Sequence, residues 1–326
     1  MRVAQFREFG GLGALRVEDV PEPSAGPGEA VIRVEAVGFN FFDTLVLRNE
    51  YQITPPLPFS PGAEIAGVVE SVGSGVIEFL PGQRVVAFIG GYGAREKIVT
   101  KARNLIPIPD GVGDEVAAGI PVAYGTAFHA LQDRAQLKPQ ESIAVLGAAG
   151  GAGLAAVELA KLMGARVIAV ASSDNKLALA VAHGADEGIN YTDTDLKAAL
   201  KSRTGGKGVD VVYDCVGGSH AEPALRATAW EGRYLVLGFA SGTIPRIALN
   251  LVLLKGCSIV GVFWTSFVER NPEKHRANTI ELLKWCEEGR ITPHIHGTFS
   301  LAETGSALSL IETRKVTGKV IVKPQV

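Results

Sequence analysis

The first third of the chain has the pattern of apolar and polar positions that is typical of short β-strands. Apolar and polar side chains alternate between Ala30 and Val37, which is the period of a strand with one buried face. Apolar runs follow in PGAEIAGVVESVGSGVIEF and PGQRVVAF, and glycines and prolines interrupt them about every eight to twelve residues. This pattern predicts a small β-barrel or β-sandwich.

The pattern changes near Asp114, and from Ile143 onward short apolar runs alternate with helical periodicity. Such an alternation indicates a parallel sheet with helices on both faces. A helix over about 272–288 and the closing segment GKVIVKP have a mixed pattern, and both could belong to the first domain. We expect strands at 143–146 and in RVIAV, VDVVYDCVG, RYLVLGFA and CSIVGVFW, and helices over 151–163, 175–183 and 195–202.

The segment IAVLGAAGGAGLAAVELAK joins a strand to a helix through a glycine-rich turn. Its glycines, at positions 147, 150, 151 and 153, miss the strict G-x-G-x-x-G spacing. A helix N-terminus after such a turn offers free N–H groups and a partial positive charge to a pyrophosphate. A plain tight connection would use the same glycines, but the strand, the helix and the second strand RVIAV in register favour dinucleotide binding.

The end of the second strand discriminates between the two nicotinamide cofactors. Ala171 stands where an NAD-binding chain is expected to carry an acid for the ribose 2′-hydroxyl. Ser172, Ser173 and Lys176 follow, and their hydroxyls and ammonium suit a 2′-phosphate. The nearby acid Asp174 slightly favours NAD, and the two serines could instead cap the next helix. We favour NADP.

Composition narrows the class of protein. The length of 326 residues suits two domains, and 47% hydrophobic with 20% charged residues indicates a globular chain. A net charge of −2 without a basic run gives no reason to expect nucleic acid or a membrane as partner. The three cysteines are too few and too distant for a disulfide framework, and the start lacks the apolar core of a signal peptide. We predict a cytoplasmic protein.

The chain resembles a known family along nearly its whole length. The segments GAAGGAGLAAVELAKLMGARVIAVASSDNK, VGFNFFDTL, PGAEIAGVVESVGSGV and PGQRVV are similar to those of zinc-free medium-chain dehydrogenase/reductases, above all NADPH:quinone oxidoreductases. The two-residue intervals between Gly147, Gly150 and Gly153 are characteristic of that branch. The resemblance implies an α/β fold with a GroES-like β domain (1–120 and 265–326) and a Rossmann doubly wound parallel-sheet domain (121–264) that binds NADP. It also implies a homodimer built along the sheet edge at CSIVGVFW.

The same resemblance addresses metal binding. Zinc-dependent relatives carry a Cys in the segment that matches VGFNFFD and a His in the segment that matches PGAE, where this chain has Asn40 and Ala63. The four-cysteine zinc lobe is absent from the first 214 residues, and the six histidines are not spaced to supply three ligands. We therefore predict no metal. Hydride transfer without a Lewis acid requires an acceptor that is already electrophilic, such as a quinone or an enone.

Three residues after the strand that ends in VGF are candidates for the acceptor site. The resemblance places Asn40 beside the nicotinamide ribose and Tyr51 over the acceptor, where its hydroxyl could donate a hydrogen bond or a proton. Asp43 is a weaker candidate. The alternatives are that Asn40 caps a turn, Asp43 caps a helix and Tyr51 packs in a cleft.

The resemblance also implies a set of cofactor-binding residues at strand ends and helix starts. Thr126 could instead be an ordinary helical threonine, Trp264 a core side chain and Lys319 a surface lysine, whereas Cys215 is expected to be a small buried residue rather than a redox nucleophile. The implied set is Asn40, Thr126, Gly150, Gly151, Ala152, Gly153, Ser172, Ser173, Lys176, Tyr191, Val216, Gly238, Phe239, Phe263, Trp264 and Lys319.

The sequence favours one function, which is given first here, and leaves two alternatives open. The first is an NADPH-dependent reductase of quinones or enones. The second is an enoyl-thioester reductase, which Tyr51 permits, although no basic cluster is visible for coenzyme A phosphates. The third is a non-catalytic NADPH-binding protein with a structural or sensor role.

Overall fold

A computed structural model describes all residues, 1–326, and divides them into two compact units. The first unit holds residues 1–123, 276–289 and 293–326, and the second holds 124–275 and 290–292. The later boundary therefore falls at Arg276 and not at the expected residue 265. None of the helices combines the length and the apolar character that a membrane crossing requires.

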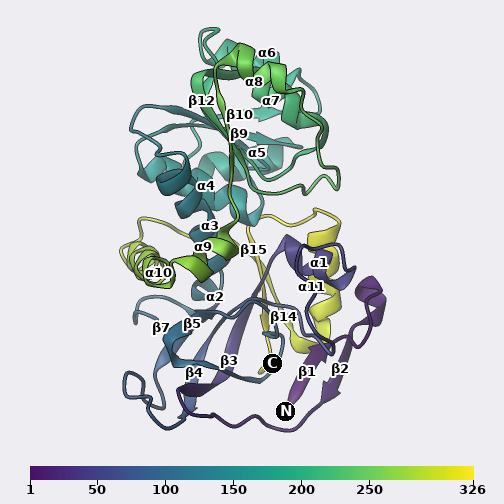
Figure 1. The fold of residues 1–326 in the computed structure, drawn as a ribbon, viewed down its shortest axis with the longest axis vertical. Helices are drawn as coiled ribbons and strands as arrows, with labels where there is room; N and C mark the ends of the chain where they lie inside the picture. The colour runs from purple at the N-terminus through teal and green to yellow at the C-terminus, as the bar shows by residue number, and fades with distance from the viewer. The chain divides into compact units, whose positions relative to one another are not determined.

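The first unit is built on a seven-stranded sheet that is largely antiparallel (Figure 1). The strands follow the order β14-β15-β3-β4-β5-β7, with β6 also paired to β3. A separate pair joins β1 (Arg2–Gln5) to β2 (Arg16–Asp19). The sheet strands are β3 (Glu29–Phe39), β4 (Glu64–Val72), β5 (Arg84–Phe88), β6 (Lys97–Lys101), β7 (Ile106–Pro107), β14 (Ile295–Ser300) and β15 (Lys319–Lys323).

The expected alternation in β3 is only partly realised, because this strand is central. It pairs with β4, β6 and β15, and eight of its eleven residues are buried, including the run from Ala36 to Phe39. Both faces are covered at that end of the strand. The pairing of Val320 with Phe39 places the closing segment of the chain in this sheet, beside the residues that lead into α1 (Phe41–Leu47).

Two helices complete the apolar core of this unit. Helix α11 (Thr304–Glu312) packs on β14 and β15, and α1 packs against α11 (Figure 1). An ion pair between Arg48 and Glu312 links the ends of these two helices. The short helix α2 (Asp114–Ala117) lies where the sequence pattern was expected to change, and its residues contact β3 and β4.

The second unit contains a six-stranded parallel sheet in the order β10-β9-β8-β11-β12-β13, which confirms the predicted doubly wound fold (Figure 1). Every neighbouring pair is parallel. The strand order reverses between β8 and β11, and ligands of such sheets bind at that switch point, beyond the carboxyl ends of the strands. The strands are β8 (Ser142–Leu146), β9 (Arg166–Ala171), β10 (Glu187–Asn190), β11 (Val209–Asp214), β12 (Thr228–Val236) and β13 (Ser258–Gly261).

Helices cover both faces of this sheet. Buried side chains of α6 (Leu196–Arg203), α7 (Ala221–Arg226) and α8 (Leu249–Lys255) share one apolar core with β8, β9, β11 and β12. Helix α4 (Gly151–Leu162) also contacts β8 and β9 but lies outside that core and packs against α3 (Gly125–Phe128). The remaining helices of this unit are α5 (Asp174–Ala182) and α9 (Trp264–Arg270). Helix α10 (Pro272–Glu287) begins in the second unit, but from Arg276 onward it belongs to the first, as the sequence pattern suggested.

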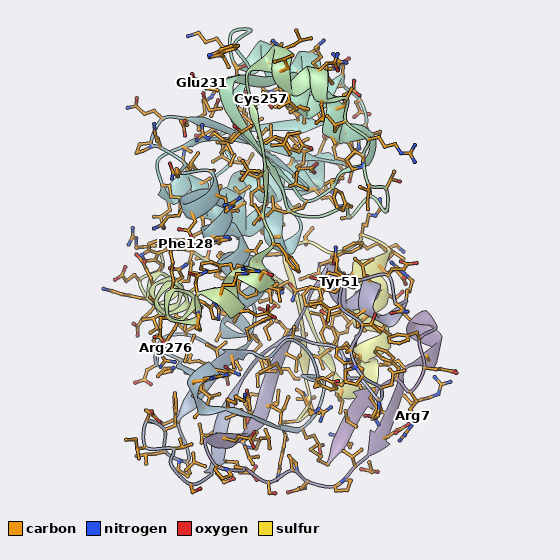
Figure 2. The ribbon with its side chains drawn as sticks, in the orientation of Figure 1. Arg7, Tyr51, Phe128, Glu231, Cys257 and Arg276 are labelled. Atoms are coloured by element: carbon orange, nitrogen blue, oxygen red, sulfur yellow. The ribbon has the colours of Figure 1, made fainter.

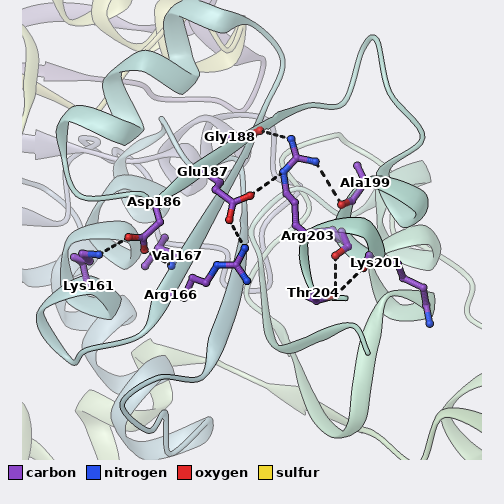
Figure 3. Close-up of polar contacts among 11 residues, drawn as sticks. Lys161, Arg166, Val167, Asp186, Glu187, Gly188, Ala199, Lys201, Arg203 and Thr204 are labelled. Carbon is purple, nitrogen blue, oxygen red and sulfur yellow. Dashed lines mark hydrogen bonds and ion pairs between the residues drawn. The ribbon is translucent and has the colours of Figure 1, made fainter. Parts of the chain in front are cut away.

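Charged side chains tie together the outer strands β9 and β10 and helix α6 (Figure 3). Glu187 receives ion pairs from Arg166 and from Arg203, and Arg203 also donates to the carbonyl of Gly188 at 3.0 Å. Lys161 pairs with Asp186 at 2.5 Å. These contacts are at the surface, so each contributes little to stability.

Candidate functional site

The first unit carries a buried polar cluster around Lys319, the first residue of β15. Its ammonium donates to Glu64 Oε1 at 2.6 Å, to Asn40 Oδ1 at 2.7 Å and to the carbonyl oxygen of Phe39 at 3.1 Å. Lys319 is only 2% exposed. All three ammonium protons therefore have acceptors, and Lys319 is not a surface lysine in this unit. The structure brings together Asn40 and Lys319, as both were expected to lie near one site.

Sequence reasoning missed Glu64, the centre of this cluster. Glu64 is fully buried at the start of β4, and its Oε1 accepts both from Lys319 and, at 2.8 Å, from the Asn40 amide. Its other oxygen accepts from the backbone N–H of Val122 at 2.7 Å. The available signal was an acid directly before the apolar run IAGVV, because acids are almost never fully buried unless they are paired.

Asp43 connects the turn before α1 to the backbone just before β4. It is 1% exposed, and its two oxygens accept from the N–H groups of Asn40 at 2.8 Å and of Gly62 at 2.9 Å. The first bond closes the N-terminal turn of α1, as a capping residue does. Burial raises the pKa of the Asp43 carboxyl to about 7, although the two N–H donors oppose the shift. Its position is that of a structural cross-link beside the Lys319 cluster.

The raised pKa of Asp43 predicts a pH-dependent stability. The folded chain keeps a proton on this carboxyl up to about pH 7, whereas the unfolded chain loses it near pH 3.8, the ordinary pKa of an aspartic acid side chain. The contribution of Asp43 to the free energy of unfolding is thus greatest below pH 3.8. It falls by about 1.4 kcal/mol per pH unit as the pH rises from there toward 7. Urea unfolding of wild type and Asp43→Asn between about pH 5 and pH 8 measures this, and the wild type should lose stability relative to the variant up to about pH 7. A difference that stays constant over this range would contradict the assignment.

Tyr51 follows α1 and lies in the same unit (Figure 2). Its side chain is partly buried, and its ring centroid is 5.4 Å from that of Phe42 with a tilt of 30°. The Tyr51 ring packs against Phe42, which fixes its orientation. This geometry agrees with the alternative that Tyr51 is a packing residue. A role of its hydroxyl toward an acceptor stays a prediction.

In the second unit the glycine turn has the geometry of an open helix N-terminus. Gly147 adopts φ +75°, Gly150 is the extended N-cap of α4, and the first helical bond runs from Leu154 N–H to the Gly150 carbonyl at 2.8 Å. The N–H groups of Gly151, Ala152 and Gly153 precede that bond and point along the helix start. A Cβ on Gly153 would lie 2.1 Å from the Gly147 carbonyl oxygen, so this position requires glycine.

The polar residues after β9 lie at the same edge of the sheet. Ala171 is 2% exposed, and the Lys176 ammonium lies 3.3 Å from the hydroxyl of Ser172. Ser173 occupies the N-cap position of α5, but no side-chain capping bond forms, so its hydroxyl does not have the role that the capping alternative gave it. Asp174 accepts from the Asn190 amide at 3.1 Å, which draws this acid toward the end of β10.

Aromatic rings mark the neighbouring strand ends. Tyr191, just after β10, has its ring centroid 4.2 Å from that of His220. Burial lowers the pKa of His220, which favours the neutral ring. At the end of β11, Asp214 accepts from the N–H groups of Val216 at 2.7 Å and Gly217 at 2.9 Å.

The structure distinguishes among three of the proposed cofactor ligands, Val216, Gly238 and Phe239. The Val216 carbonyl accepts from Ser241 N–H at 2.9 Å, so with its N–H on Asp214 both backbone groups of Val216 already have partners. Gly238 and Phe239 follow β12 as expected, at the same sheet edge, and both are partly exposed. The Phe239 carbonyl already accepts from Gly242 N–H at 2.8 Å, so the N–H groups of Gly238 and Phe239 are better placed than the backbone of Val216 to bind a ligand.

The segment VFW lies partly outside the sheet. Strand β13 ends at Gly261, Phe263 is 48% exposed, and Trp264 begins helix α9 with an exposed fraction of 5%. The indole packs so closely on α3 that a Cβ on Gly125 would be 3.0 Å from the ring. Trp264 is thus a core side chain of the second unit. Thr126, the next residue of α3, is partly exposed.

Two family models match the chain. The model described as "Alcohol dehydrogenase GroES-like domain" matches residues 26–110, and the model described as "Zinc-binding dehydrogenase" matches residues 151–285. They fall on the β-rich first unit and largely on the parallel-sheet unit. The two matches support the division of the chain that the contacts within each unit show.

Individual proteins match nearly the whole chain. Quinone oxidoreductase-like protein 2 of Rattus norvegicus is 40% identical over 94% of this chain and 88% of its own length. A quinone oxidoreductase of Pseudomonas aeruginosa is 35% identical over 98% of both chains. The solved structure of Escherichia coli quinone oxidoreductase complexed with NADPH superimposes with a TM-score of 0.92 at 28% identity, over 99% of this chain and 100% of that one.

The residues of this chain do not fit the zinc ion that the second family description mentions. No three His, Cys, Asp or Glu side chains lie together as a metal would require. At Asn40 and Glu64 the potential oxygen ligands are occupied by the Lys319 ammonium. A buried ammonium there would repel a second cation. The histidines pair elsewhere, as in His183 with Glu158 at 2.6 Å.

Proposed function

Since the chain belongs to the medium-chain dehydrogenase/reductase family, in its quinone-oxidoreductase branch, we propose that it is an NADPH-dependent reductase of quinones or enones. The observation that carries the cofactor choice is the end of β9, where buried Ala171 replaces an acid and Lys176 lies 3.3 Å from the Ser172 hydroxyl. These groups favour a 2′-phosphate over a ribose hydroxyl. The NADPH bound by the Escherichia coli relative supports the same choice.

The second unit would hold the cofactor. The N–H groups at the start of α4 would bind the pyrophosphate, and Ser172, Ser173 and Lys176 the 2′-phosphate. Tyr191 would cover the adenosine end, and Gly238 and Phe239 would contribute backbone groups toward the nicotinamide. When bound, NADPH supplies a hydride to the acceptor.

The first unit would supply the groups that stabilise the reduced acceptor. A quinone takes up one hydride and one proton to give the hydroquinone, while NADPH becomes NADP⁺. The Tyr51 hydroxyl would donate a hydrogen bond or the proton to the forming oxyanion. Asn40 would contact the cofactor, and the bonds of its amide to Glu64 and Lys319 would keep that side chain in one orientation. Asp43 keeps the turn before α1 in place.

The proposal is tested by NADPH oxidation with 1,4-benzoquinone, cyclohexenone and crotonyl-coenzyme A. We expect turnover with the quinone or the enone. Turnover with the thioester alone would indicate an enoyl-thioester reductase instead. NADPH binding without turnover on any of the three would indicate a non-catalytic protein, and either result would overturn the proposal.

Replacing Lys176 by glutamate is expected to weaken NADPH binding and to leave NADH binding nearly unchanged. The substitution places a negative charge beside Ser172, where the 2′-phosphate is proposed to bind. We expect the KM for NADPH to rise by at least about tenfold, since a charge-assisted contact is replaced by repulsion. Lys207→Glu, an exposed change in the same unit, is the control. An equal effect on both cofactors would contradict the 2′-phosphate pocket.

We further propose that the chain acts in the cytoplasm as a homodimer joined at strand β13. This strand ends the sheet, and its Ile259 is 41% exposed. Nearby side chains are also apolar and exposed, at 79% for Leu253 and 72% for Leu254. A strand edge with such neighbours is a template for pairing with a second copy of itself. The free cysteines agree with a reducing compartment.

The dimer proposal predicts that Ile259→Lys gives a monomer. A lysine on the sheet edge adds charge where two strands would pair. Light scattering after size exclusion should report twice the chain mass for wild type and the single mass for the variant. Ile77→Lys, at a position 87% exposed in the first unit, should remain dimeric. A monomeric wild type would contradict the proposal.

A further inference from the structure

The first unit also contains a pocket, which lies where β5 leads to β6. Its volume is about 290 Å³, near the lower limit of small-molecule sites. No member of the Lys319 cluster lines it. The lining residues are mostly apolar, with one cation, one phenol and one hydroxyl among them: Pro23, Ile89, Gly91, Tyr92, Arg95, Ile98, Val99 and Thr100.

Arg95 lines this pocket without an acidic partner. No carboxylate lies within 4.0 Å of its guanidinium, and its Nε is buried with no hydrogen-bond acceptor. The acid next to it in sequence, Glu96, is engaged by Arg2 at 2.7 Å, and Glu22, which precedes the lining residue Pro23, is engaged by Lys97 at 2.8 Å. Burial lowers the pKa of Arg95, but an arginine stays charged. A partly buried guanidinium whose Nε–H has no acceptor would be stabilised by a bound anion.

The backbone beside Arg95 is held in an unfavourable conformation. Tyr92 has φ +69°, which is rare for a bulky residue. Its N–H donates to the Ser60 carbonyl at 2.7 Å, its hydroxyl donates to the Pro56 carbonyl at 3.0 Å, and its ring stands edge-on to Phe59 at 4.6 Å. These contacts place the ring under the guanidinium, 5.7 Å from its carbon. The surrounding contacts thus hold the aromatic wall of the pocket in a fixed position.

We propose that this Arg95 pocket binds a small carboxylate with an apolar body. The carboxylate would accept from the Arg95 guanidinium, including the buried Nε, and the apolar part would lie on Ile89 and Ile98. A phosphate suits the pocket less well, because a single cation and mostly aliphatic walls leave a doubly charged group under-solvated. The Thr100 hydroxyl accepts from the Asn104 amide at 3.2 Å, and its own proton could be donated to the carboxylate.

Benzoate tests the proposal in solution. Calorimetric titration of the full chain should show saturable binding of benzoate at one site, and weaker or absent binding of benzyl alcohol and of inorganic phosphate. The measurement needs neither NADPH nor an acceptor, so its result is independent of the proposed reductase activity. Equal binding of benzoate and benzyl alcohol, or none of either, would overturn the proposal.

A matched pair of variants assigns the binding to Arg95. Arg95→Met keeps the length of the side chain and should weaken benzoate binding by at least about tenfold. Arg103→Met removes an exposed arginine from the same unit and should bind benzoate like the wild type. Arg95→Met breaks no ion pair, so its melting temperature should equal that of the wild type or exceed it. Unchanged benzoate binding by a folded Arg95→Met variant would overturn the proposal.

Discussion

Lys319→Met is expected to destabilise the first unit by about 3–5 kcal/mol, because the substitution leaves the Glu64 carboxylate buried without its counter-charge. The side chains of Lys319 and Glu64 are 3% and 0% exposed, and their charged atoms lie 2.6 Å apart. The Asn40 amide also loses the donor to its oxygen.

Hydrogen exchange of backbone amides in β3 and β15 measures this effect in the unit concerned, since a single transition is not assured for a chain of two units. Lys323→Met is the matched control. Its ion pair with Glu115 has side chains 37% and 33% exposed, so the expected loss is about 1 kcal/mol or less.

The double variant Lys319→Met/Glu64→Gln should recover much of the lost stability, because it removes both charges together. It should not recover reductase activity if the cluster orients Asn40 toward the cofactor. If Lys319→Met lost no more stability than the Lys323→Met control, the buried pair of Lys319 and Glu64 would not be what holds β15 to the sheet.

Gly153→Ala is expected to disrupt the strand-to-helix turn of the second unit. The added Cβ would lie 2.1 Å from the Gly147 carbonyl oxygen and 2.7 Å from its carbon, and both are backbone atoms that cannot turn aside. Helix α4 must then shift from the sheet, at a cost of about 1–3 kcal/mol. The same shift moves the N–H groups at the helix start, so NADPH affinity should fall by at least about tenfold.

Gly150→Ala, three residues earlier in the same turn, is the matched control. Gly150 has φ −77°, and the nearest atom to an added Cβ is the Gly147 oxygen at 3.5 Å, an ordinary contact. Its thermal stability should stay close to that of the wild type. Fluorescence titration with NADPH and thermal unfolding measure the two effects. Equal stability of both variants would contradict the packing argument for Gly153.

Local patterns predicted the second unit well. The run IAVL, the glycine turn and the following helical pattern are contiguous, and the structure has β8 and α4 at those positions. The strand RVIAV and the helix after Ser173 agree as well. Strands and helices joined by short connections depend on neighbouring residues, so periodicity and turn chemistry suffice to locate them.

The apolar run VIEF after Gly75 shows where periodicity is less informative. Strand β4 ends at Val72, and the residues after it form no strand, with Ile77 87% exposed. A short apolar run becomes a strand only when a partner edge is within reach. Likewise Trp264 ends no strand, because its indole fills the space against Gly125.

The candidate site was only half visible in the sequence. Asn40, Asp43 and Lys319 were identified through the family resemblance, which says nothing of how they are held. Glu64 was overlooked because an acid before an apolar run does not show that it is buried and paired until its partner is known. That partner, Lys319, is 255 residues away along the chain.

The sequence by itself determined the two kinds of unit, the glycine turn and the lack of an acid at Ala171, because each depends on residue types at fixed local spacing. The tertiary structure alone decided which charges are buried together. Pairing of β15 with β3 brings Lys319 to Asn40, and pairing of β4 with β3 brings Glu64 beside both. The energy of a buried charge depends on what surrounds it, and only the folded sheet defines those surroundings.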